Sequence, residues 1–476
     1  MTGVQTCALP IYGDNVPNFV RLKRDDPAKV LPGYDYDVTS TDALLRRFII
    51  ANGAIQTPEG IHYRAFVLPR SRILPLAALQ FAERYVQSGG TLVGLRPLRS
   101  QGVVPDAEAT QFAAIAETLW AACDQTSDHH IAIGKGELFC TDNAREAMQA
   151  NGILPDFEGS QNPSLDYIHR HSADADIYFI RNVKPQPLHT SVTFRVDGKQ
   201  PEIFDAVTGQ VHQSLLFTPT PDHRTSIPLS LEPYGSVFVI FRYPASKNFV
   251  VSIARNGTSL YVAAHPDQAM LPEGLNIQGG TVSTLNTPLS GDYDITFSSG
   301  GTKRLNTSHA NAIDIPGPWT VRFPANWGAP PQVQLTKLDS WTTSPDPGVR
   351  YFSGTATYQT KLNLTEAQLT GEYALWLNLG EVHEVAAVRV NGKPAGTLWK
   401  QPFSVRVDGL LKPGENIVEV DVTNLWPNRL IGDAQSPTDK HYTWTNIRKY
   451  TKDSPLLPSG MLGPAVLEPV YRLPLK

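Results

Sequence analysis

The most constraining feature of this chain is an alternation of apolar and polar residues between positions 351 and 432. Apolar side chains occupy every second position in four runs, at 375–379, 388–390, 405–407 and 418–422. A period of two is typical of strands that bury one face. Asn391-Gly392 separates two of these runs and is a strong signal for a tight hairpin. This part of the chain therefore predicts an antiparallel sandwich.

Length and composition agree with several turn-rich domains. The chain has 476 residues, enough for three domains of ordinary size. Hydrophobic residues make up 41%, charged residues only 18%, and there are 39 prolines and 36 glycines, which suits β domains. The net charge of −4 gives no electrostatic case for a nucleic-acid partner or an acidic membrane. No apolar run approaches the length of a membrane span.

Residues 12–154 alternate between strand-like and helix-like patterns. A short apolar run at 65–69 is followed by helical spacing over 75–88, by Gly89-Gly90 as a stop, and by another short strand. Such a unit predicts parallel strands joined by a right-handed crossover. We expect a small three-layer α/β domain here. It resembles the amidotransferase-like accessory domain found in large glycosidases.

Beyond residue 154 the pattern is all β. Short strand-like runs separated by turns predict a β-sandwich over 155–243. Residues 244–312 are weakly patterned and are interpreted as a β-rich linking region, and 313–476 form the last sandwich. The expected fold class is multidomain α/β plus all-β, with a small three-layer α/β domain followed by β-sandwich domains.

Several segments resemble known carbohydrate-active enzymes. Four segments resemble the sugar-binding, galactose-binding-like jelly roll of β-galactosidase-type glycoside hydrolases. They are FSGTATY (352–358), LGEV (379–382), VRVNG (388–392) and NLWPNRLIGD (424–433). The last of these, with YTKDSPLLPSG (450–460), resembles the C-terminal end of α-L-rhamnosidase-like glycoside hydrolases of family 106, which YGDNVPNF (12–19) and DADIYF (174–179) also fit. The resemblance covers nearly the whole chain.

The resemblance implies that the catalytic centre lies elsewhere. In family 106 a (β/α)8 barrel that precedes these regions carries the catalytic carboxylates, and nothing here reads as eight strand–helix repeats. Residues 1–11, MTGVQTCALPI, look like a translated sequencing-adapter remnant, which we interpret as an artefactual leader from a metagenomic assembly. The family also implies export to the periplasm or the exterior, and calcium in the absent barrel. No cofactor is expected in this chain.

Three sets of residues could carry chemistry of their own, and for each a structural role is the preferred interpretation. Glu381 and Glu384 could be a carboxylate pair, but a spacing of three residues fixes no geometry for glycoside cleavage. The segment 169–176, with two His and two Asp, suggests a metal, yet its spacing is weak evidence and ordinary hydrogen bonds or an interface with the barrel are favoured. Cys123 and Cys140 could pair or, for Cys140, be activated at a helix start, but buried free thiols are expected. No catalytic or metal-binding residue is predicted.

Carbohydrate binding is the better-supported chemistry. Sugars present apolar C–H faces and a polar rim, so aromatic platforms beside amide and guanidinium groups suit them. The candidate binding residues are Trp426, Asn428, Arg429, Trp444 and Asn446. Packing of this region on the barrel is the open alternative.

The sequence therefore predicts the C-terminal accessory region of a rhamnosidase-like glycoside hydrolase, with carbohydrate and the missing barrel as partners. The region would support the barrel and would be inactive alone. A free-standing carbohydrate-binding protein is the alternative, and a complete hydrolase with its site on the α/β domain is the least favoured interpretation.

Overall fold

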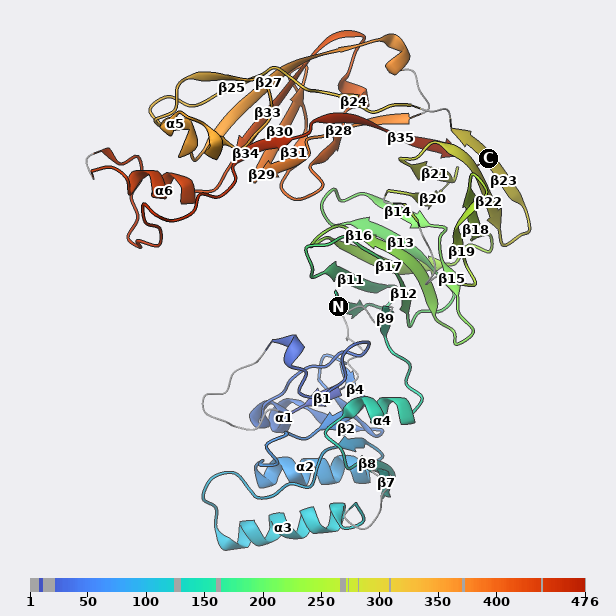
Figure 1. Ribbon diagram of the computed structural model, residues 1–476. Coiled ribbons are helices and arrows are strands. Elements are labelled where there is room, and N and C mark those ends of the chain that lie inside the picture. The colour runs from blue at the N-terminus through green and yellow to red at the C-terminus, as the bar shows by residue number, and fades with distance from the viewer. Residues whose placement is uncertain are drawn as a thin grey trace. The chain divides into compact units, whose positions relative to one another are not determined.

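The computed structural model divides the chain into two compact units (Figure 1). One unit comprises Met1–Val251 with Tyr261–Ala269, and the other comprises Ser252–Leu260 with Met270–Lys476. The structure describes residues 8–11, 22–123, 130–159, 164–265, 271–272, 274–280, 282–307, 310–369, 373–437 and 440–475.

The first unit begins with a five-stranded sheet in the order β1-β5-β6-β8-β7, parallel except for β7. Its strands are β1 (Ala8–Pro10), β5 (Ala65–Val67), β6 (Thr91–Val93), β7 (His130–Ile133) and β8 (Gly136–Phe139). The helices are α1 (Thr41–Arg47), α2 (Leu76–Gln87), α3 (Asp106–Trp120) and α4 (Ala144–Ala150). A small antiparallel sheet lies beside them, formed by β2 (Ile49–Ala51), β3 (Ala54–Gln56) and β4 (His62–Tyr63).

Successive residues of these strands enter two hydrophobic clusters, because side chains alternate across a sheet. Phe66 and Leu92 pack with residues of α1, α2 and α3, whereas Val67 and Val93 pack with residues of α4. Helices therefore pack against both faces of the sheet. The likeness to amidotransferase-like domains remains a prediction.

The predicted strand–helix–strand unit is confirmed by β5, α2 and β6. Helix α2 ends where Gly89 adopts a positive φ of 112° and Gly90 passes close to Tyr85. A Cβ at Gly90 would lie 2.2 Å from the Tyr85 ring, so a larger residue cannot fit without a shift. The two glycines thus end the helix for two different reasons, backbone conformation and space.

Part of the segment interpreted as a foreign leader is folded into the α/β domain. Residues 8–11 are buried, and β1 pairs in parallel with β5 through the register of Ala8 with Ala65. Leu9 lies in the same cluster as Phe66. As folded, these four residues complete one edge of the sheet and so belong to the α/β domain. Residues 1–7 lie outside the described part of the chain.

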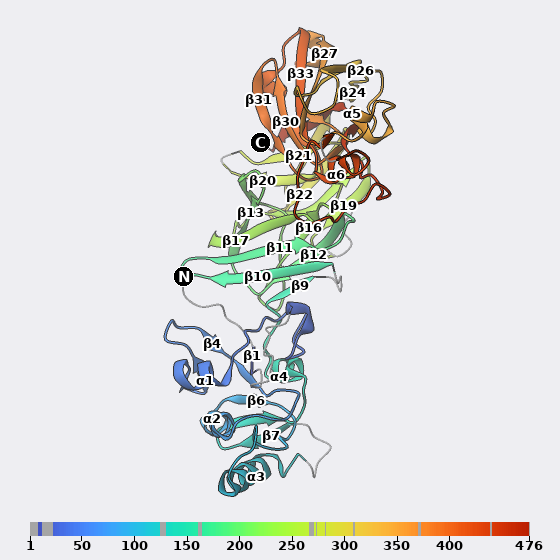
Figure 2. The same cartoon turned by 90° about the vertical axis from the view of Figure 1, so that its left-hand side faces the viewer.

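A β-sandwich completes the first unit. One face contains, in spatial order, β10 (Leu165–His171), β11 (Asp176–Asn182), β17 (Ser236–Pro244), β13 (Lys199–Asp205) and β14 (Val211–Ser214) (Figure 2). The facing sheet contains β15 (Thr218–Pro219), β16 (Thr225–Leu231), β12 (Leu188–Phe194) and β9 (Phe157–Gly159). Tyr178, Phe194 and Phe241 are fully buried between the two sheets, which accounts for the apolar alternation seen in the sequence.

The linking region is more regular than its sequence suggests. It forms a four-stranded sheet of β19 (Thr258–Val262), β18 (Val250–Arg255), β22 (Gly291–Phe297) and β23 (Thr302–Thr307). The hairpin of β20 (Asn276–Gly279) and β21 (Thr284–Thr287) pairs through β21 with the last strand of the chain, β35 (Val466–Pro474). Part of this region is therefore built into the last sandwich.

The second unit contains that last sandwich. Its six-stranded sheet has the order β26 (Gln332–Leu335), β25 (Trp319–Arg322), β27 (Thr355–Leu364), β33 (Gly414–Thr423), β30 (Val385–Val390) and β31 (Lys393–Leu398). The second sheet places β35 between β21 and β28 (Tyr373–Asn378), followed by β32 (Ser404–Arg406), and β24 (Ile313–Asp314) also pairs with β35. Smaller elements are α5 (Pro347–Arg350), β29 (Glu381–His383), α6 (Pro427–Asp433) and β34 (Gly460–Gly463).

The sequence signals for this sandwich are confirmed. Asn391 and Gly392 both have positive φ, 53° and 75°, and connect β30 to β31 as a hairpin. Leu377 of one sheet and Val420 of the other share a single hydrophobic cluster. Its assignment as a galactose-binding-like jelly roll stays a prediction. Among the described residues, every helix is too short or too polar to cross a membrane.

Candidate functional site

The predicted binding residues lie before, within and after α6, which follows β33 at one end of the last sandwich (Figure 1). Trp426 is the N-cap residue of α6 and Pro427 is its first residue, where the missing N–H of proline costs nothing. The sequence analysis did not predict this helix. Asn428 and Arg429 within the helix are buried, whereas Trp426 before it and Trp444 and Asn446 after it are exposed, and this separates the candidates into two groups.

Asn428 and Arg429 have buried side chains and bond to neighbouring segments of the sandwich. Asn428 is 2% exposed, and its side-chain amide both donates to Leu457 O (2.7 Å) and accepts from Leu457 N (2.9 Å). Arg429 is 5% exposed, and its backbone N–H donates to Ser353 Oγ at 3.2 Å. Both side chains are therefore buried at this end of the sandwich, and carbohydrate contact by them stays a prediction.

Asp433, at the end of α6, fixes the next loop to the helix. Its carboxylate lies 3.1 Å from Arg429 Nε and accepts from the backbone N–H groups of Tyr442 (3.1 Å) and Thr443 (2.9 Å). The Thr443 hydroxyl adds a third bond at 2.6 Å. The Arg429 guanidinium lies 4.7 Å from the centroid of the Tyr442 ring, a cation–π contact. The loop is thus bonded to the carboxylate of Asp433, which lies buried beside Arg429.

The remaining candidates face solvent. Trp426 is 57% exposed, Trp444 is 85% exposed, and Asn446 is exposed as well. Further exposed apolar residues on the same stretch escaped the sequence analysis, because isolated apolar residues in a loop show no period. We define the α6 face as Leu425, Trp426, Tyr442, Trp444, Ile447 and Leu457, all of which are exposed.

The acidic residues Glu381 and Glu384 lie next to this end of the sandwich, since Glu384 N donates to Thr423 O at the end of β33. The imidazole of His383 lies between them, with Nε2 2.8 Å from Glu381 Oε1 and Nδ1 3.6 Å from Glu384 Oε1. The two carboxylates therefore approach one ring on one chain segment. This arrangement agrees with the interpretation that they are no hydrolytic pair.

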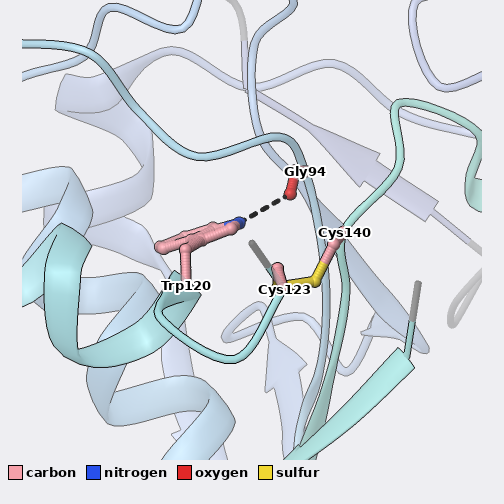
Figure 3. The surroundings of a disulfide bond; sticks show 4 residues. All are labelled: Gly94, Trp120, Cys123 and Cys140. Atoms are coloured by element: carbon pink, nitrogen blue, oxygen red, sulfur yellow. Dashed lines mark hydrogen bonds between the residues drawn. A yellow bond between two sulfur atoms is a disulfide. The ribbon is translucent and has the colours of Figure 1, made fainter. Parts of the chain in front are cut away.

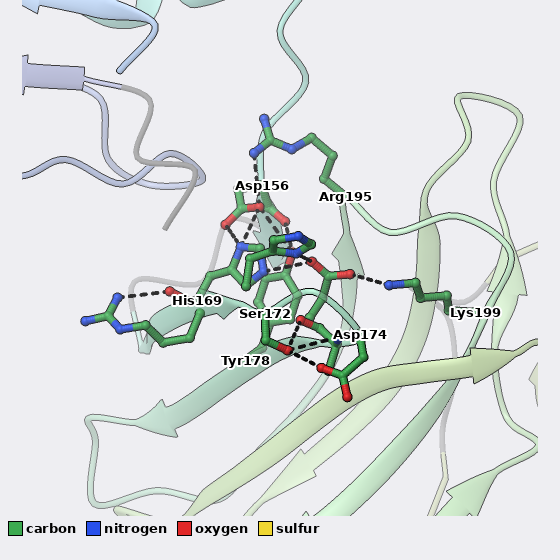
Figure 4. A network of polar contacts seen from close by, with 11 residues as sticks. Asp156, His169, Ser172, Asp174, Tyr178, Arg195 and Lys199 are labelled. Carbon is green, nitrogen blue, oxygen red and sulfur yellow. Dashed lines mark hydrogen bonds and ion pairs between the residues drawn. The ribbon is translucent and has the colours of Figure 1, made fainter. Parts of the chain in front are cut away.

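The His169 segment forms a buried polar cluster in the first sandwich (Figure 4). His169 Nδ1 lies 3.0 Å from Asp156 Oδ2, and its Nε2 lies 3.4 Å from Asp176 Oδ1. The imidazole stacks on Tyr178 with 4.0 Å between ring centroids. We call these four residues, His169, Asp156, Asp176 and Tyr178, the His169 cluster.

Further charged groups complete the cluster from neighbouring strands. Lys199 Nζ on β13 lies 2.9 Å from Asp176 Oδ2, and His171 Nδ1 lies 2.7 Å from Asp176 Oδ1. Arg195 Nη2, just after β12, lies 3.3 Å from Asp156 Oδ1. The carboxylates of Asp156 and Asp176 therefore each lie near at least two side chains that carry a positive charge or can gain one.

These contacts determine the charge of His169. Burial disfavours the imidazolium, but the carboxylates of Asp156 and Asp176 more than compensate and raise the pKa of His169 to about 9. Burial also disfavours the Asp176 carboxylate, yet His169, Lys199 and His171 together lower its pKa below the ordinary value. The pKa of Tyr178 is raised by burial and by the charge of Asp156. At neutral pH the cluster is thus a closed ion network.

Asp156 also joins this network to the α/β domain. Its backbone N–H donates to Gly33 O at 2.7 Å, and the Tyr178 hydroxyl donates to its carboxylate at 3.1 Å. The sequence analysis missed Asp156, because thirteen residues separate it from His169 and no motif links them. Within the described residues no group of three or more His, Cys, Asp or Glu side chains is arranged to hold a metal ion.

Cys123 and Cys140 form a disulfide bond, so the expectation of free thiols was wrong (Figure 3). Their Cα atoms lie 6.1 Å apart, within the range that a disulfide spans. Helix α3 ends at Trp120, whose Nε1 donates to Gly94 O at 2.9 Å and orients the following turn toward the end of β8. The pairing also excludes Cys140 as a free nucleophile in this structure.

The chain is similar to known carbohydrate-active proteins. Residues 7–218 match the model of the α-L-rhamnosidase family, glycoside hydrolase family 106. A solved rhamnosidase from Novosphingobium sp. PP1Y is 26% identical with a TM-score of 0.71, over 98% of this chain and 39% of that one. A protein of Formosa agariphila whose name carries a provisional β-glucuronidase assignment is 25% identical, over 96% of this chain and 54% of that protein. The chain thus spans about half the length of this curated relative.

Proposed function

Because this chain is a relative of the α-L-rhamnosidase-like glycoside hydrolases, we propose that it is the accessory region of such an enzyme. In this proposal its domains support a catalytic domain, and the α6 face contacts carbohydrate. The observation that carries the proposal is the similarity to the rhamnosidase over 98% of this chain but only 39% of that one. The larger part of that relative lies outside the match, and the family resemblance would assign the catalytic barrel, with any calcium, to it.

The chemistry of glycoside cleavage supports an inactive role for this chain. Retaining and inverting enzymes hold two carboxyl groups about 5 to 10 Å apart on opposite sides of the scissile bond. Glu381 and Glu384 instead both contact the ring of His383, at 2.8 Å and 3.6 Å, and lie on one chain segment. We therefore propose that glycoside hydrolysis requires groups outside this chain.

A hydrolysis assay tests this proposal. The purified chain is incubated with an aryl α-L-rhamnoside, and aglycone release is compared with that of a Glu381→Gln/Glu384→Gln double variant. We expect both proteins to give the same rate as buffer alone. Release by the parent chain that the double variant lacks would overturn the accessory role.

A second candidate function is that of a free-standing carbohydrate-binding protein. The exposure of Trp426 and Trp444 favours it, because sugar binding by stacking needs accessible indole rings. A titration with rhamnosides, monitored by tryptophan fluorescence, distinguishes the binding protein from the accessory region. A saturable change that Trp444→Ala abolishes would favour the binding protein, whereas no change would favour support of a catalytic domain.

Export to the periplasm or the exterior is part of the same proposal. The Cys123–Cys140 disulfide supports it, because disulfides persist in oxidising compartments and are rare in the cytosol. Carbohydrate and the catalytic domain are the proposed partners, and neither nucleic acid nor a membrane is needed for this role.

A further inference from the structure

The loop that carries half of the α6 face is unusually basic. Residues 440–453 contain Lys440, Arg448, Lys449 and Lys452, all exposed, against the single carboxylate of Asp453. The chain as a whole has a net charge of −4. Within residues 440–453 none of these four cations pairs with a carboxylate, and Lys449 Nζ lies 5.5 Å from the centroid of the Tyr450 ring.

Exposed aromatic rings lie within the same loop. Trp444 is separated from Arg448 by three residues, and Ile447 precedes Arg448 directly. Both apolar side chains are exposed, as is Trp426 at the start of α6. Apolar side chains exposed together in a soluble protein commonly mark a contact surface. The loop thus offers apolar and cationic groups within a few residues of each other.

The backbone of this loop is fixed where the rings emerge. Asp433 holds the N–H groups of residues 442 and 443, and the Tyr442 ring lies between the Arg429 guanidinium and Gly328. A Cβ at Gly328 would approach the Tyr442 ring to 2.9 Å, so this contact is close. Trp444 therefore projects from an anchored backbone, which lowers the entropy cost of binding.

We propose that the α6 face and its basic loop bind an acidic polysaccharide, whose pyranose units carry carboxylates. The apolar C–H face of a pyranose would stack on Trp444 or Trp426, and Lys and Arg side chains would pair with the carboxylates. The cations favour a charged ligand, because a neutral glycan can only hydrogen-bond to Lys and Arg through its hydroxyl groups, whereas carboxylates form stronger, charge-assisted bonds with them. This inference rests on the proposed carbohydrate contact and specifies its substrate class.

The test compares oligogalacturonate with its methyl ester, which has the same backbone without the charges. Binding to the full chain is followed by calorimetry and tryptophan fluorescence. We expect saturable binding of oligogalacturonate, about tenfold weaker binding of the ester, and marked weakening between about 50 mM and about 500 mM NaCl. Trp444→Ala and Lys449→Gln should each weaken binding several-fold. Trp399→Ala is the matched control, because Trp399 is also exposed (58%) but lies outside this loop, and it should change nothing.

Three outcomes would overturn the inference. Equal affinity for the acid and its ester would contradict the acidic class while leaving the carbohydrate contact of the proposed function intact. Binding that Trp444→Ala and Lys449→Gln do not alter would place the site elsewhere. No binding of either polymer would mean that this face serves another partner, such as the catalytic domain. None of these outcomes depends on whether the chain hydrolyses a rhamnoside.

Discussion

The His169 cluster and the α6 face share a buried pair of a cationic side chain and an Asp, but the groups around the pair differ. Both contain a buried cationic side chain against Asp, stacked on or under a Tyr ring. In the His169 cluster every carboxylate is enclosed by several cations from neighbouring strands. At the α6 face the buried pair Arg429–Asp433 instead anchors a loop whose aromatic and basic side chains face solvent.

This difference separates residues that hold the fold from residues available to a ligand. A buried charge without its partner costs far more than a surface charge, so buried networks are expected to control stability. Exposed rings and cations contribute little to stability and are free to bind. A polar cluster of His and Asp is therefore weaker evidence for function here than an exposed loop of Trp and Lys.

Removal of Asp156 should give the largest effect. Asp156→Ala leaves His169, Tyr178 and Arg195 without their shared acceptor, and we expect a loss of about 4 kcal/mol in the unfolding free energy of the first unit. Urea unfolding followed by circular dichroism measures it. Asp174→Asn, at an exposed carboxylate of the same segment, is the control and should leave stability nearly unchanged. Equal losses of stability in the two variants would show that the buried network matters no more to the fold than an exposed carboxylate.

Asp433→Ala should destabilise the second unit by about 3 kcal/mol, because Arg429 stays buried without a carboxylate. The loop at 440–446 would also lose three hydrogen bonds and, with them, its fixed orientation. Thermal unfolding reports the first effect and proteolysis within the loop the second. Asp453→Asn serves as the exposed control. A variant that keeps the loop protected would show that the ion pair does not anchor it.

The disulfide provides a covalent reference within the first unit. Its half-cystines are 17 residues apart, and closing a loop of this size stabilises a fold by about 3 kcal/mol. We expect the Cys123→Ser/Cys140→Ser variant to unfold at lower denaturant than the parent, and dithiothreitol to shift the parent to the same midpoint. If dithiothreitol left the unfolding midpoint of the parent chain unchanged, the disulfide would not stabilise the fold.

The charge of His169 should make the first unit sensitive to alkali. Its folded pKa of about 9 exceeds the ordinary value of 6.5, so its contribution is complete below about pH 6.5 and is lost as pH rises through 9. We expect a loss of about 2 kcal/mol between pH 7 and pH 9.5. The lowered pKa of Asp176 acts in the opposite direction, and its contribution is lost in acid.

Unfolding curves of the parent and of His169→Gln across this pH range check the alkaline loss. The variant should show a much flatter profile, whereas His223→Gln, at an exposed imidazole beside Asp197, should follow the parent. Parallel profiles for all three proteins would assign the alkaline loss to other groups.

Trp444→Ala should have the smallest effect on stability, below about 0.5 kcal/mol, because its ring is 85% exposed. The same substitution should weaken glycan binding several-fold. Thermal unfolding and the binding titration together measure the contrast. A large loss of stability would show that the indole packs on the fold and is not available to a ligand.

The sequence predicted local elements well, because their signals are local. The hairpin at Asn391-Gly392 and the helix ended by Gly89-Gly90 depend on backbone preferences that neighbouring residues express. The two-residue alternation likewise placed the strands of the last sandwich.

The site residues were predicted only in part, since their environment depends on distant segments. Asp156 acquires its role from β10 and β11, and the disulfide depends on how α3 ends beside β8. Arg429 is buried because residues 427–433 form a helix that the flanking strand pattern does not indicate. Trp444 was proposed from the sequence because an aromatic ring near amide and guanidinium groups suits a sugar, a pattern that needs no knowledge of the fold, and its role stays a prediction.

Hydrogen–deuterium exchange of the chain with and without oligogalacturonate tests the central contrast most directly. Our account predicts new protection within residues 425–457 and unchanged exchange around His169, which is already enclosed. Protection around residues 156–199, or no protection at any position while the ligand is bound, would contradict it.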